Sequence, residues 1–506
     1  MGHRFFIMIS FKNVTYKYAN DPTPAVKNLS FDINSGESLC LMGANGSGKT
    51  TLARLIAGLI KPFRGRIDIG HNGNTKVGIL FQNPDNQMVA VTVEKEIAFV
   101  LENQNVPLKE METRITQTLE RFSITHLRKK LNSELSGGEK QRVALASVMI
   151  AEPSILLLDE PDSFLDQEGR FVLRAELKKL RESAPDMIQI HISQYPFTAL
   201  NYDRLLIIHQ GEIIADNMPK VIFENEKLCN MAKLFYNPDL TDQIKFPEFY
   251  SQKTNNNNDY IKRIELKNIC YSYHDEPVPI IKNLNLSILV GQVLGVAGSS
   301  GTGKSTLGLM LCGLINPTNG EIAYFNNNGE VIRTDEIAGK VSAVLQQPER
   351  QFFLSTCSEE IEFGPANFAH PLSTVEVSSL LDMVGLKAEI FRNRDPFQLS
   401  GGEKRRLAFA SILSMIPGII VFDEPTCGLD QEGVGRFVAL ANFLKKMGIG
   451  IVIISHDGDL LRTLSDNVLL MDKESRHSLM TTDKFFNDSK LAAIISPLTW
   501  SASYFK

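Results

Sequence analysis

The stretch that decides the fold is "GANGSGKTT", Gly43–Thr51, which recurs as "GSSGTGKST", Gly298–Thr306. Both match G-x-x-x-x-G-K-[ST], a pattern whose glycines allow backbone N–H groups to curl around a phosphate chain. Lys49 and Lys304 would neutralise the β- and γ-phosphates, and the hydroxyl that follows each lysine can ligate Mg²⁺. A chain of this length holds on the order of 0.02 such matches by chance. Two matches therefore predict two phosphate-binding loops.

The two loops belong to a tandem repeat. The segment "YKYANDPTPAVKNLSFDINSGESLCLMGANGSGKTT", from Tyr16, is echoed from Tyr271. The loop lysines are 255 positions apart, whereas the later Asp159 and Asp423 are 264 apart, so the second copy has nine additional residues. We expect these residues in the turn region at 326–329.

Composition excludes several classes of protein. The 506 residues carry a net charge of −5, so no basic field points to nucleic acid. Six cysteines without a C-x-x-C pair argue against a zinc or iron–sulfur site and fit a reducing cytosol. The longest uncharged apolar-rich run, 407–422, is interrupted and too short to span a bilayer. We expect no signal peptide or lipid anchor at the N-terminus, where Met8 is an alternative start.

Each half alternates short β-rich runs with helical patterns, which predicts an α/β fold with a mainly parallel sheet. The runs 39–42 and 293–297 each end in a phosphate-binding loop. The runs 155–158 and 419–422 are apolar throughout, and an aspartate follows each. A strand covered on both faces has this pattern, and its carboxyl end delivers a functional residue.

Periodicity fades between the two copies, where Asn255 to Asn258 form a polar tract. We therefore predict a first domain at 8–224, a linker at 225–260 and a second domain at 261–506.

An Asp-Glu pair follows each apolar run. Asp159 and Asp423 would hold Mg²⁺, directly or through water, and Glu160 and Glu424 are placed to orient or deprotonate the attacking water. An Asp-Glu pair alone is also typical of a solvated strand end. Its position after a phosphate-binding loop and a buried strand favours the catalytic interpretation.

A third repeated element is "LSGGEKQ", Leu135–Gln141, and "LSGGEKR", Leu399–Arg405. Ser136 and Ser400 suit the N-cap of a helix, and the glycines that follow expose amides that attract anions. An ordinary capped helix explains one such segment. A phosphate-binding loop in each half favours a second phosphate-binding element.

These elements, with a glutamine loop at Gln82 and Gln346 and a following S-x-L-D segment (Ser163-Phe164-Leu165-Asp166 and Cys427-Gly428-Leu429-Asp430), occur in the order of ATP-binding cassette (ABC) ATPases. The chain resembles that family over nearly all of both halves. The resemblance implies two tandem P-loop ATPase domains, each with a mainly parallel sheet core, an antiparallel β part and a helical subdomain. It also implies that the two domains pair head to tail within the chain, with each ATP held between one phosphate-binding loop and the LSGGE segment of the other half.

The resemblance assigns the remaining site residues, with ATP and Mg²⁺ as substrate and cofactor. The implied ATP-binding residues are Tyr18, Gly43, Ala44, Asn45, Gly46, Ser47, Gly48, Lys49, Thr50, Thr51, Gln82, Ser136, Gly137, Gly138, Glu139, Tyr273, Gly298, Ser299, Ser300, Gly301, Thr302, Gly303, Lys304, Ser305, Thr306, Gln346, Ser400, Gly401, Gly402 and Glu403. The implied Mg²⁺ ligands are Thr50, Gln82, Asp159, Ser305, Gln346 and Asp423. Tyr18 and Tyr273 match the aromatic residue that stacks on adenine, although a strand tyrosine is the alternative.

The two halves differ where the family has a switch histidine. The second half has His456 in "IVIISHDGD", whereas the first half, "IQIHISQYP", aligns Gln194 with it. Gln194 can donate a hydrogen bond to a phosphate but cannot carry a charge. His191 lies three residues early, so we expect a hydrogen-bonded strand histidine. We therefore predict unequal sites, with Glu160, Glu424, His456 and Gln194 as catalytic residues and the Lys304/His456 site as the main hydrolytic one.

The stretch "FQNPDNQMVAVTVEKEIAF", 81–99, closely resembles the ATPases of energy-coupling factor (ECF) importers, which take up vitamins and transition metals. "LQQPERQFFLSTCSEEIEF", 345–363, is similar in a diverged form. In such a loop Pro84 stiffens the turn, polar side chains can lock the backbone, and Thr92 can cap the following helix. The resemblance implies an integral membrane coupling protein and a membrane substrate-binding protein as partners, at the cytoplasmic face of the membrane.

Two alternatives remain open. Fused sugar-importer ATPases have two cassettes, but typically an altered second signature, which this chain lacks. Soluble paired-cassette translation factors usually carry a long charged helical linker and favour RNA, whereas this linker region is short and rich in asparagine. The cargo stays undetermined among cobalt, nickel, biotin, riboflavin and a thiamine precursor.

Overall fold

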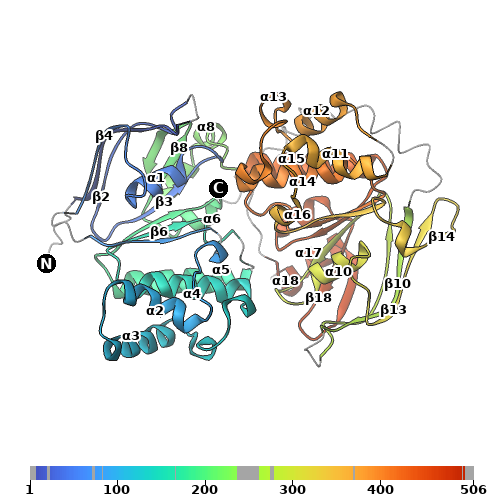
Figure 1. Cartoon of the computed structure of the whole chain (residues 1–506), viewed down its shortest axis with the longest axis horizontal. Coiled ribbons are helices and arrows are strands. Elements are labelled where there is room, and N and C mark those ends of the chain that lie inside the picture. The colour runs from blue at the N-terminus through green and yellow to red at the C-terminus, as the bar shows by residue number, and fades with distance from the viewer. Residues whose placement is uncertain are drawn as a thin grey trace. The chain divides into compact units, whose positions relative to one another are not determined.

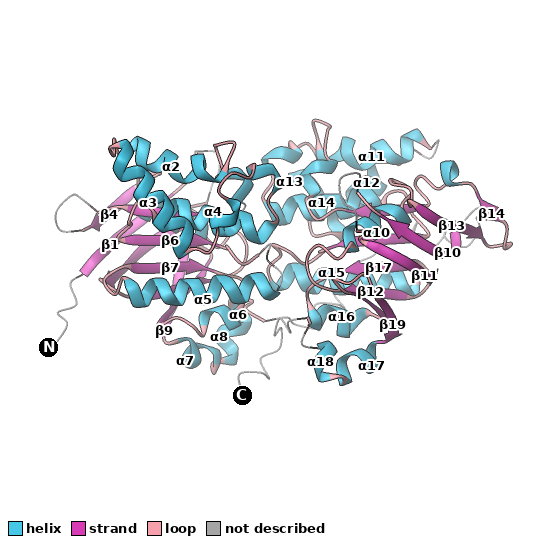
Figure 2. Ribbon diagram, turned by 90° about the horizontal axis from the view of Figure 1, so that it is seen from below, coloured by secondary structure: helices cyan, strands magenta, loops and turns pink. Residues whose placement is uncertain are grey.

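The computed structural model describes residues 7–19, 23–70, 75–82, 84–163, 165, 167–235, 261–273, 278–368, 371–492 and 494–495. These residues form two compact units, and the division falls after Phe235. Each unit combines two sheets with surrounding helices, as Figure 1 and Figure 2 show, so the predicted tandem α/β fold is confirmed. Asn83, Phe164, Asp166 and the Asn255–Asn258 tract lie outside the described residues.

The central sheet of the first unit is parallel except at one edge. Its six strands follow the order β5-β6-β7-β3-β8-β9, and only β9 pairs antiparallel with its neighbour. In that order the strands are β5 (Val77–Leu80), β6 (Ile155–Asp159), β7 (Ile188–Ile192), β3 (Ser38–Met42), β8 (Arg204–His209) and β9 (Glu212–Asn217).

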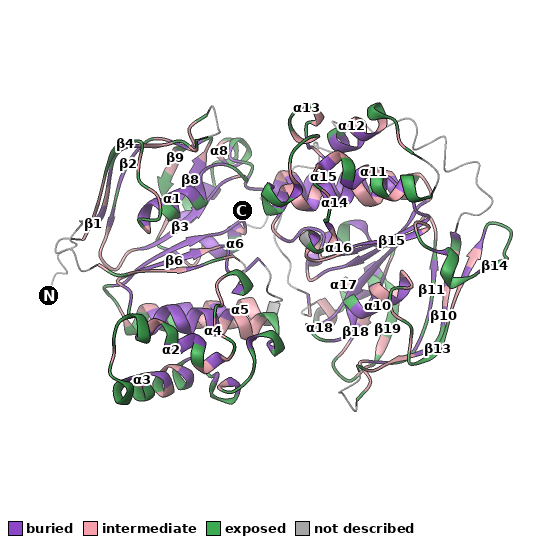
Figure 3. Cartoon of the chain, viewed as in Figure 1, coloured by how far each residue is buried: buried purple, intermediate pink, exposed green. Residues whose placement is uncertain are grey.

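The central strands are buried on both faces, and Figure 3 colours them as buried. Successive side chains of a strand point to opposite faces. In β6, Ile155 and Leu157 pack with an antiparallel sheet, and Leu156 and Leu158 pack with helices. This two-sided burial explains why the sequence of β6 is apolar throughout.

A three-stranded antiparallel sheet covers one face, in the order β2-β1-β4, together with α1 (Lys49–Ile56). Its strands are β1 (Ile7–Tyr16), β2 (Val26–Asn34) and β4 (Arg64–Ile69). The remaining helices of the first unit are α2 (Val93–Asn103), α3 (Leu108–Arg121), α4 (Gly137–Met149), α5 (Gln167–Ser183), α6 (Pro196–Ala199), α7 (Pro219–Phe223) and α8 (Glu226–Met231).

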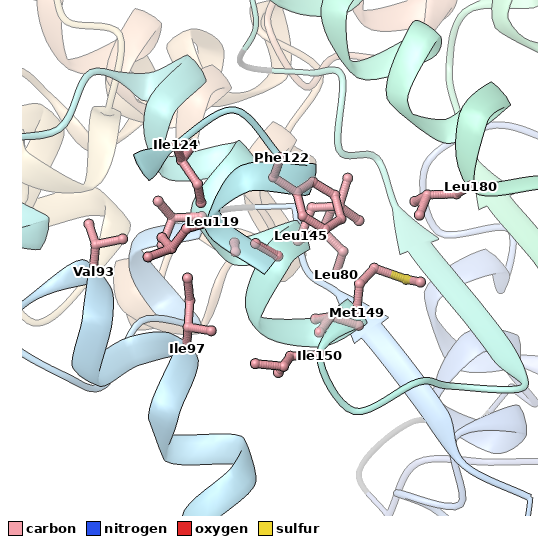
Figure 4. Close-up of a cluster of buried hydrophobic side chains, with 14 of the residues drawn as sticks. Leu80, Val93, Ile97, Leu119, Phe122, Ile124, Leu145, Met149, Ile150 and Leu180 are labelled. Carbon is pink, nitrogen blue, oxygen red and sulfur yellow. The ribbon is translucent and has the colours of Figure 1, made fainter. Parts of the chain in front are cut away.

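Helices α2 to α5 cover the other face through one apolar cluster. Figure 4 shows Leu80 of β5 and Leu145 of α4 within this cluster, together with Ile97 of α2 and Leu119 of α3. The helical part therefore shares a single core with the carboxyl ends of β5 and β6, which carry the candidate site residues.

The second unit repeats this plan. Its central sheet has the order β15-β16-β17-β12-β18-β19, with β19 antiparallel, and its second sheet has the order β11-β10-β13-β14. The strands are β10 (Ile261–Tyr271), β11 (Ile281–Leu289), β12 (Val293–Ala297), β13 (Asn319–Asn326), β14 (Val331–Ile332), β15 (Val341–Val344), β16 (Ile419–Asp423), β17 (Gly450–Ile454), β18 (Asn467–Met471) and β19 (His477–Thr481). The helices are α10 (Lys304–Leu311), α11 (Cys357–Asn367), α12 (Thr374–Met383), α13 (Ala388–Phe391), α14 (Gly401–Leu413), α15 (Gln431–Lys446), α16 (Gly458–Leu464), α17 (Thr482–Asn487) and α18 (Ser489–Ala492).

The structure describes two regions that carry sequence-based expectations: the turn at 326–329 and the start of the predicted linker. The turn at 326–329 joins β13 to β14, an edge strand that the three-stranded sheet of the first unit lacks in its described order. At the start of the predicted linker, 225–235 is ordered: α8 follows α7, and Cys229 and Leu234 are buried in the first unit. Apolar packing therefore continues past 224.

Among the described helices, none combines the length and the apolar character that a membrane crossing requires.

Candidate functional site: two phosphate-binding loops with an Asp-Glu pair

Both phosphate-binding loops lie where the sequence predicts them, between a buried strand and a helix. The first joins β3 to α1, and the second joins β12 to α10. The residue before each lysine is a glycine in the left-handed region, with φ of 110° at Gly48 and 87° at Gly303. A side chain at Gly48 would also bring its Cβ to 2.4 Å from the carbonyl oxygen of Ala25. The glycines are therefore required by backbone conformation and by close approach.

Each loop lysine is buried and folds back on its own loop. Lys49 Nζ donates hydrogen bonds to the carbonyls of Gly43 and Ala44, at 2.8 and 3.0 Å. Lys304 Nζ donates to Gly298 and Ser299, at 2.8 and 2.7 Å. The positive charge is thereby held inside the loop, beside the amides of a helix N-terminus, where a phosphate chain is favoured.

The two predicted adenine-stacking tyrosines lie beside the loops. The Tyr18 hydroxyl is 3.1 Å from Thr51 Oγ1, and the Tyr273 hydroxyl is 2.9 Å from Thr306 Oγ1. Tyr273 is 47% exposed, so its ring is accessible to a ligand. Both rings therefore lie at the start of the helix that follows the loop.

The strand aspartates face the hydroxyl that follows each lysine. Thr50 Oγ1 lies 3.4 Å from Asp159 Oδ1. Burial raises the pKa of Asp159 above its ordinary value, although the Thr50 hydroxyl and Lys49 oppose the shift. Burial also raises the pKa of Asp423, opposed by Ser305 and Lys304. A cation bound at either carboxylate would favour its ionised form.

The glutamates that follow have an unusual backbone. Glu160 and Glu424 have φ of 48° and 50°, in the left-handed region that side-chain-bearing residues rarely adopt. Their amides donate to Ile192 and Ile454 on the neighbouring strand, at 3.0 and 2.9 Å. Strained residues of this kind cluster at functional sites, where the surrounding fold holds them in place.

The carboxylate of Glu160 is surrounded by neutral donors. Gln194 Nε2 donates to Oε1 at 2.7 Å, and Gln82 Nε2 and Ser163 Oγ donate to Oε2 at 3.1 and 3.3 Å. Burial raises the pKa of Glu160, Lys49 opposes that shift, and Asp159 adds to it. The structure thus brings together Lys49, Asp159, Glu160, Gln82 and Gln194 at the carboxyl edge of the sheet.

In the second unit the corresponding carboxylate faces the histidine. The His456 amide donates to Glu424 Oε1 at 3.1 Å, its Nε2 lies 3.7 Å from the same oxygen, and Ser455 Oγ donates to Oε2 at 3.3 Å. In the first unit Gln194 occupies this place and also reaches Asn45 of the loop at 3.0 Å. The sequence alignment of Gln194 with His456 therefore agrees with the structure.

His191 does not approach this site. It is buried in β7, where its Nδ1 is 2.6 Å from the Tyr202 hydroxyl and its Nε2 is 3.8 Å from Asp162 Oδ1. The expectation of a strand histidine with a hydrogen-bond partner is confirmed for Nδ1.

The LSGGE segments begin helices as predicted. Ser136 caps α4 and Ser400 caps α14, each in a reciprocal capping box with the glutamate three residues later. Ser136 Oγ and Ser400 Oγ donate to Glu139 and Glu403 at 2.8 and 2.7 Å. Among the described residues, these serines make side-chain hydrogen bonds only within their own segments, not to the loop of the same unit.

A polar loop follows Gln82 in the first unit and Gln346 in the second. In each unit a second glutamine hydrogen-bonds this loop to the strand that precedes it. Gln87 accepts from the Phe81 amide at 3.0 Å and donates to the Ile79 carbonyl at 3.3 Å, and Gln351 makes the same pair of bonds in the second unit. Thr92 occupies the N-cap of α2 without a side-chain cap hydrogen bond, whereas Thr356 caps α11 in full. The predicted cap is therefore wrong for the Thr92 hydroxyl.

Sequence reasoning missed two buried glutamates that join this loop to its helix. Glu96 accepts from the amides of Val89 and Ala90 at 3.0 and 2.8 Å. Glu360 accepts from Phe353 and Leu354, both at 2.6 Å. Their signal is a glutamate four residues after the N-cap threonine in both copies.

Arg405 was also missed as a site residue. In the second unit it donates to the backbone carbonyl of Glu424 and, at 2.6 Å, to that of Gln346. It therefore links the glutamine loop to the catalytic strand end. The first unit has Gln141 at this position, and that is the one difference between the LSGGEKR and LSGGEKQ segments.

Comparison with known proteins agrees with this geometry. The family model described as "ABC transporter" matches residues 26–163 and 281–427, more than half of the chain. A protein of Methanosarcina mazei, provisionally named an ABC transporter ATP-binding protein, is 30% identical over 488 residues, which cover 92% of this chain and 93% of the relative.

Two further similarities carry more specific names. YkoD of Bacillus subtilis, provisionally named an HMP/thiamine import ATP-binding protein, is 29% identical over 92% of this chain and 90% of its own length. The solved structure of CbiO1 from Clostridium perfringens, described as part of the ABC transporter complex CbiONQ, is 30% identical with a TM-score of 0.40, and covers 45% of this chain and 95% of CbiO1. BL0043 of Bifidobacterium longum is 29% identical over 91% of this chain, which spans only 64% of that relative.

Proposed function

The chain belongs to the ABC transporter family of ATP-binding proteins, and on that premise we propose that it is the ATPase subunit of an ECF-type importer. Its cargo would be a vitamin or a transition metal ion. The observation that carries the proposal is the loop after Gln82, whose sequence resembles ECF ATPases and whose rigid attachment suits a coupling element. The name of YkoD, which refers to HMP/thiamine import, supports the same class of cargo.

We infer from the family that the two units pair head to tail, so that each ATP touches a phosphate-binding loop and the opposite LSGGE segment. Ser136 to Glu139 would then complete the Lys304 site, and Ser400 to Glu403 the Lys49 site. ATP binding would stabilise the pair, since a ligand stabilises the state that it binds, and hydrolysis would release it.

Within each site, separate groups of the chain bind the phosphates and activate the attacking water. The loop amides and the lysine bind the phosphates, and the strand-end glutamate orients the attacking water and accepts its proton. The raised pKa of Glu160 brings the carboxyl closer to the pH at which a general base works best.

The site is chemically suited to Mg²⁺. Thr50 and Asp159 supply hard oxygen donors, as do Ser305 and Asp423, with Gln82 and Gln346 as further candidate ligands. When bound with the nucleotide, Mg²⁺ would neutralise charge that develops on the phosphate oxygens.

A surface for a membrane partner lies next to the glutamine loops. Val89 and Val91 are exposed in the first unit, and Phe353 and Phe363 are exposed in the second. The two phenylalanine rings pack edge to face, with their centroids 4.7 Å apart. Apolar side chains held on a rigid polar loop suit contact with a helix of a partner at the cytoplasmic face of the membrane.

The test is a pull-down of the full chain from gently solubilised membranes of its own source, with mass spectrometry of the co-purifying proteins. We expect a polytopic membrane protein and a small hydrophobic one, and the latter would identify the cargo. Val89→Asp should reduce this co-purification, whereas Val331→Asp, at an equally exposed valine (65% against 66%), should not. Ribosomal proteins, or no membrane protein at all, would contradict the importer proposal and favour a soluble cassette ATPase.

A further inference from the structure

The first unit has a polar pocket outside its nucleotide site. It lies against α5, β7 and α6, which Figure 2 labels near one another. Its empty space is about 390 Å³, including the part open to solvent. The residues that matter here are Arg170, Arg174, Lys178, Asp162, Gln189 and His191.

One face of α5 supplies the positive charge of this pocket. Arg170, Arg174, Lys178 and Arg181 line it at helical spacing, against Asp162 as the one carboxylate among the lining residues. Within the described part of the chain, neither Arg174 nor Lys178 has a carboxylate partner in an ion pair. Arg174 is held in place by the ring of Phe197, 4.7 Å from its guanidinium. A guanidinium that is fixed in place, with no carboxylate of the described residues at ion-pair distance, is suited to an oxyanion.

Buried polar atoms at the base of the pocket lack partners. Gln189 Oε1, His191 Nε2 and Asp162 Oδ1 have no hydrogen-bond partner among the described residues, although all three side chains are at least nine-tenths buried. His191 Nε2 and Asp162 Oδ1 are 3.8 Å apart, beyond hydrogen-bonding distance. Orphaned buried groups of this kind require an explanation such as a bound water or ligand.

The tautomer of His191 depends on its hydrogen bond with Tyr202. We take the Tyr202 hydroxyl as the donor to His191 Nδ1, 2.6 Å away. Nε2 then carries the hydrogen and is a donor. The pocket thus offers cationic and neutral donors together with one carboxylate acceptor.

The second unit shows that the fold does not need this pocket. Asp159 pairs with Ile192 and Asp423 pairs with Ile454, so His191 corresponds to Ile453. At the 264-residue offset, Arg170 and Arg174 correspond to Val434 and Val438, which are buried. The same helix–sheet contact is therefore apolar in one copy and charged in the other.

We propose that this pocket binds inorganic phosphate, with Arg174 and Lys178 neutralising its charge, His191 donating to an oxygen, and Asp162 accepting from its P–OH group. Phosphate carries at least one such hydroxyl at neutral pH, whereas sulfate carries none and would leave the Asp162 carboxylate facing an anion unpaired. The site would therefore select phosphate over sulfate, because only phosphate can donate a hydrogen bond to Asp162. Other binding sites reject an analogue that lacks a required hydrogen-bonding group in the same way.

The test is equilibrium dialysis of radiolabelled phosphate against the full chain at pH 7, in a Lys49→Ala/Lys304→Ala background that removes the loop lysines. We expect one bound phosphate, at least tenfold weaker binding in Arg174→Val, and about threefold weaker binding in Lys178→Ala, whose exposed side chain makes misfolding no concern. Lys179→Ala removes the same charge outside the pocket and should bind phosphate as the parent does.

Sulfate provides the second measurement. A tenfold excess of sulfate should leave phosphate binding unchanged in the parent, and should compete in Asp162→Asn, where the carboxylate is replaced by an amide that can donate. No bound phosphate in the parent, equal competition by sulfate in the parent, or unchanged binding in both Arg174→Val and Lys178→Ala would each overturn the proposal.

Discussion

In the first unit, the Glu160 carboxylate accepts hydrogen bonds from Gln194, Gln82 and Ser163, all neutral side chains. In the second unit, Glu424 faces His456, an imidazole that can gain and lose a proton near neutral pH. The two phosphate-binding loops, by contrast, agree in glycine conformation and in lysine hydrogen bonds. The duplicated chain has kept the geometry that binds a phosphate chain and has changed the groups around the catalytic carboxylate.

The two units also differ in the side chains that lie beneath the nucleotide site. Asp162 and His191 lie where the second unit has Thr426 and Ile453, and arginines of α5 replace buried valines of α15. Positions that are charged or titratable in the first copy are thus uncharged in the second, where Thr426 is the polar residue among them. Two central sheets with the same strand order can therefore carry different side chains behind the same strand.

The largest expected difference between the two units is in catalysis. Glu424→Gln should lower ATP turnover by about a thousandfold, because it removes the general base of the site that has the histidine. Glu160→Gln should leave turnover within a factor of about three, because its carboxylate already accepts from several neutral donors and its site lacks the histidine. Steady-state phosphate release by the purified full chain gives both values.

Binding of ATP by both glutamine variants is the control for that comparison, since a lost nucleotide site would mimic lost chemistry. Turnover near the parent value in Glu424→Gln, with turnover abolished in Glu160→Gln, would reverse the assignment of the main hydrolytic site.

The next effect concerns the stability of β7. Burial raises the pKa of Asp162, but His191, Arg170 and Thr198 outweigh it, so the net pKa is lowered and the carboxylate is charged. His191→Ile should therefore destabilise β7 by about 2 kcal/mol, because the buried Asp162 carboxylate loses its favourable interaction with the imidazole 3.8 Å away. Asp162→Thr/His191→Ile, which copies the second unit, should recover most of the loss.

Hydrogen exchange of β7 peptides measures this local free energy, which suits a chain with two units better than one global unfolding curve. Additive losses in the double variant would show that Asp162 and His191 do not interact.

A smaller effect is expected at the histidine itself. His456→Gln gives the second site the residue of the first and should lower turnover about tenfold, the value of one charge-assisted hydrogen bond lost in the transition state. Gln194→His is the reciprocal change. Gln194→His combined with His456→Gln tests whether the first site can then take over. If turnover stays tenfold low, the surroundings of Glu160, and not residue 194 alone, limit the first site.

The smallest expected effect is at Arg405. Arg405→Gln introduces the first unit's residue and removes two hydrogen bonds to the Gln346 and Glu424 carbonyls, so the glutamine loop should lose about 1 kcal/mol of local stability. Hydrogen exchange of the peptides around Gln346 checks this, with Lys404→Gln as the matched control on the same helix. Equal exchange in the two variants would contradict a linking role for Arg405.

Much of this comparison could be predicted from sequence. Buried strands that end in Asp159 and Asp423 are apolar throughout because both faces are covered, and this pattern is visible without coordinates. The alignment of Gln194 with His456, and the strand position of His191, follow from short repeats of fixed spacing.

Other features could not be predicted because they depend on contacts between segments far apart in the chain. Glu96 is a site-shaping residue only because its carboxylate meets amides of the preceding loop and Asn132, at 3.3 Å. The missing Thr92 cap has a local cause instead. The third residue of α2 is Lys95, whereas the third residue of α11 is Glu359, which completes a capping box with Thr356.

The left-handed backbone of Glu160 and Glu424 has a consequence for directed evolution. Glycine and asparagine tolerate this conformation better than glutamate does, so either would relieve strain of about 1 kcal/mol or more. A selection for heat resistance alone would therefore enrich variants that have lost the base while keeping an intact fold. Screens of this chain for stability need turnover as a second criterion, because the two properties oppose each other at these two positions.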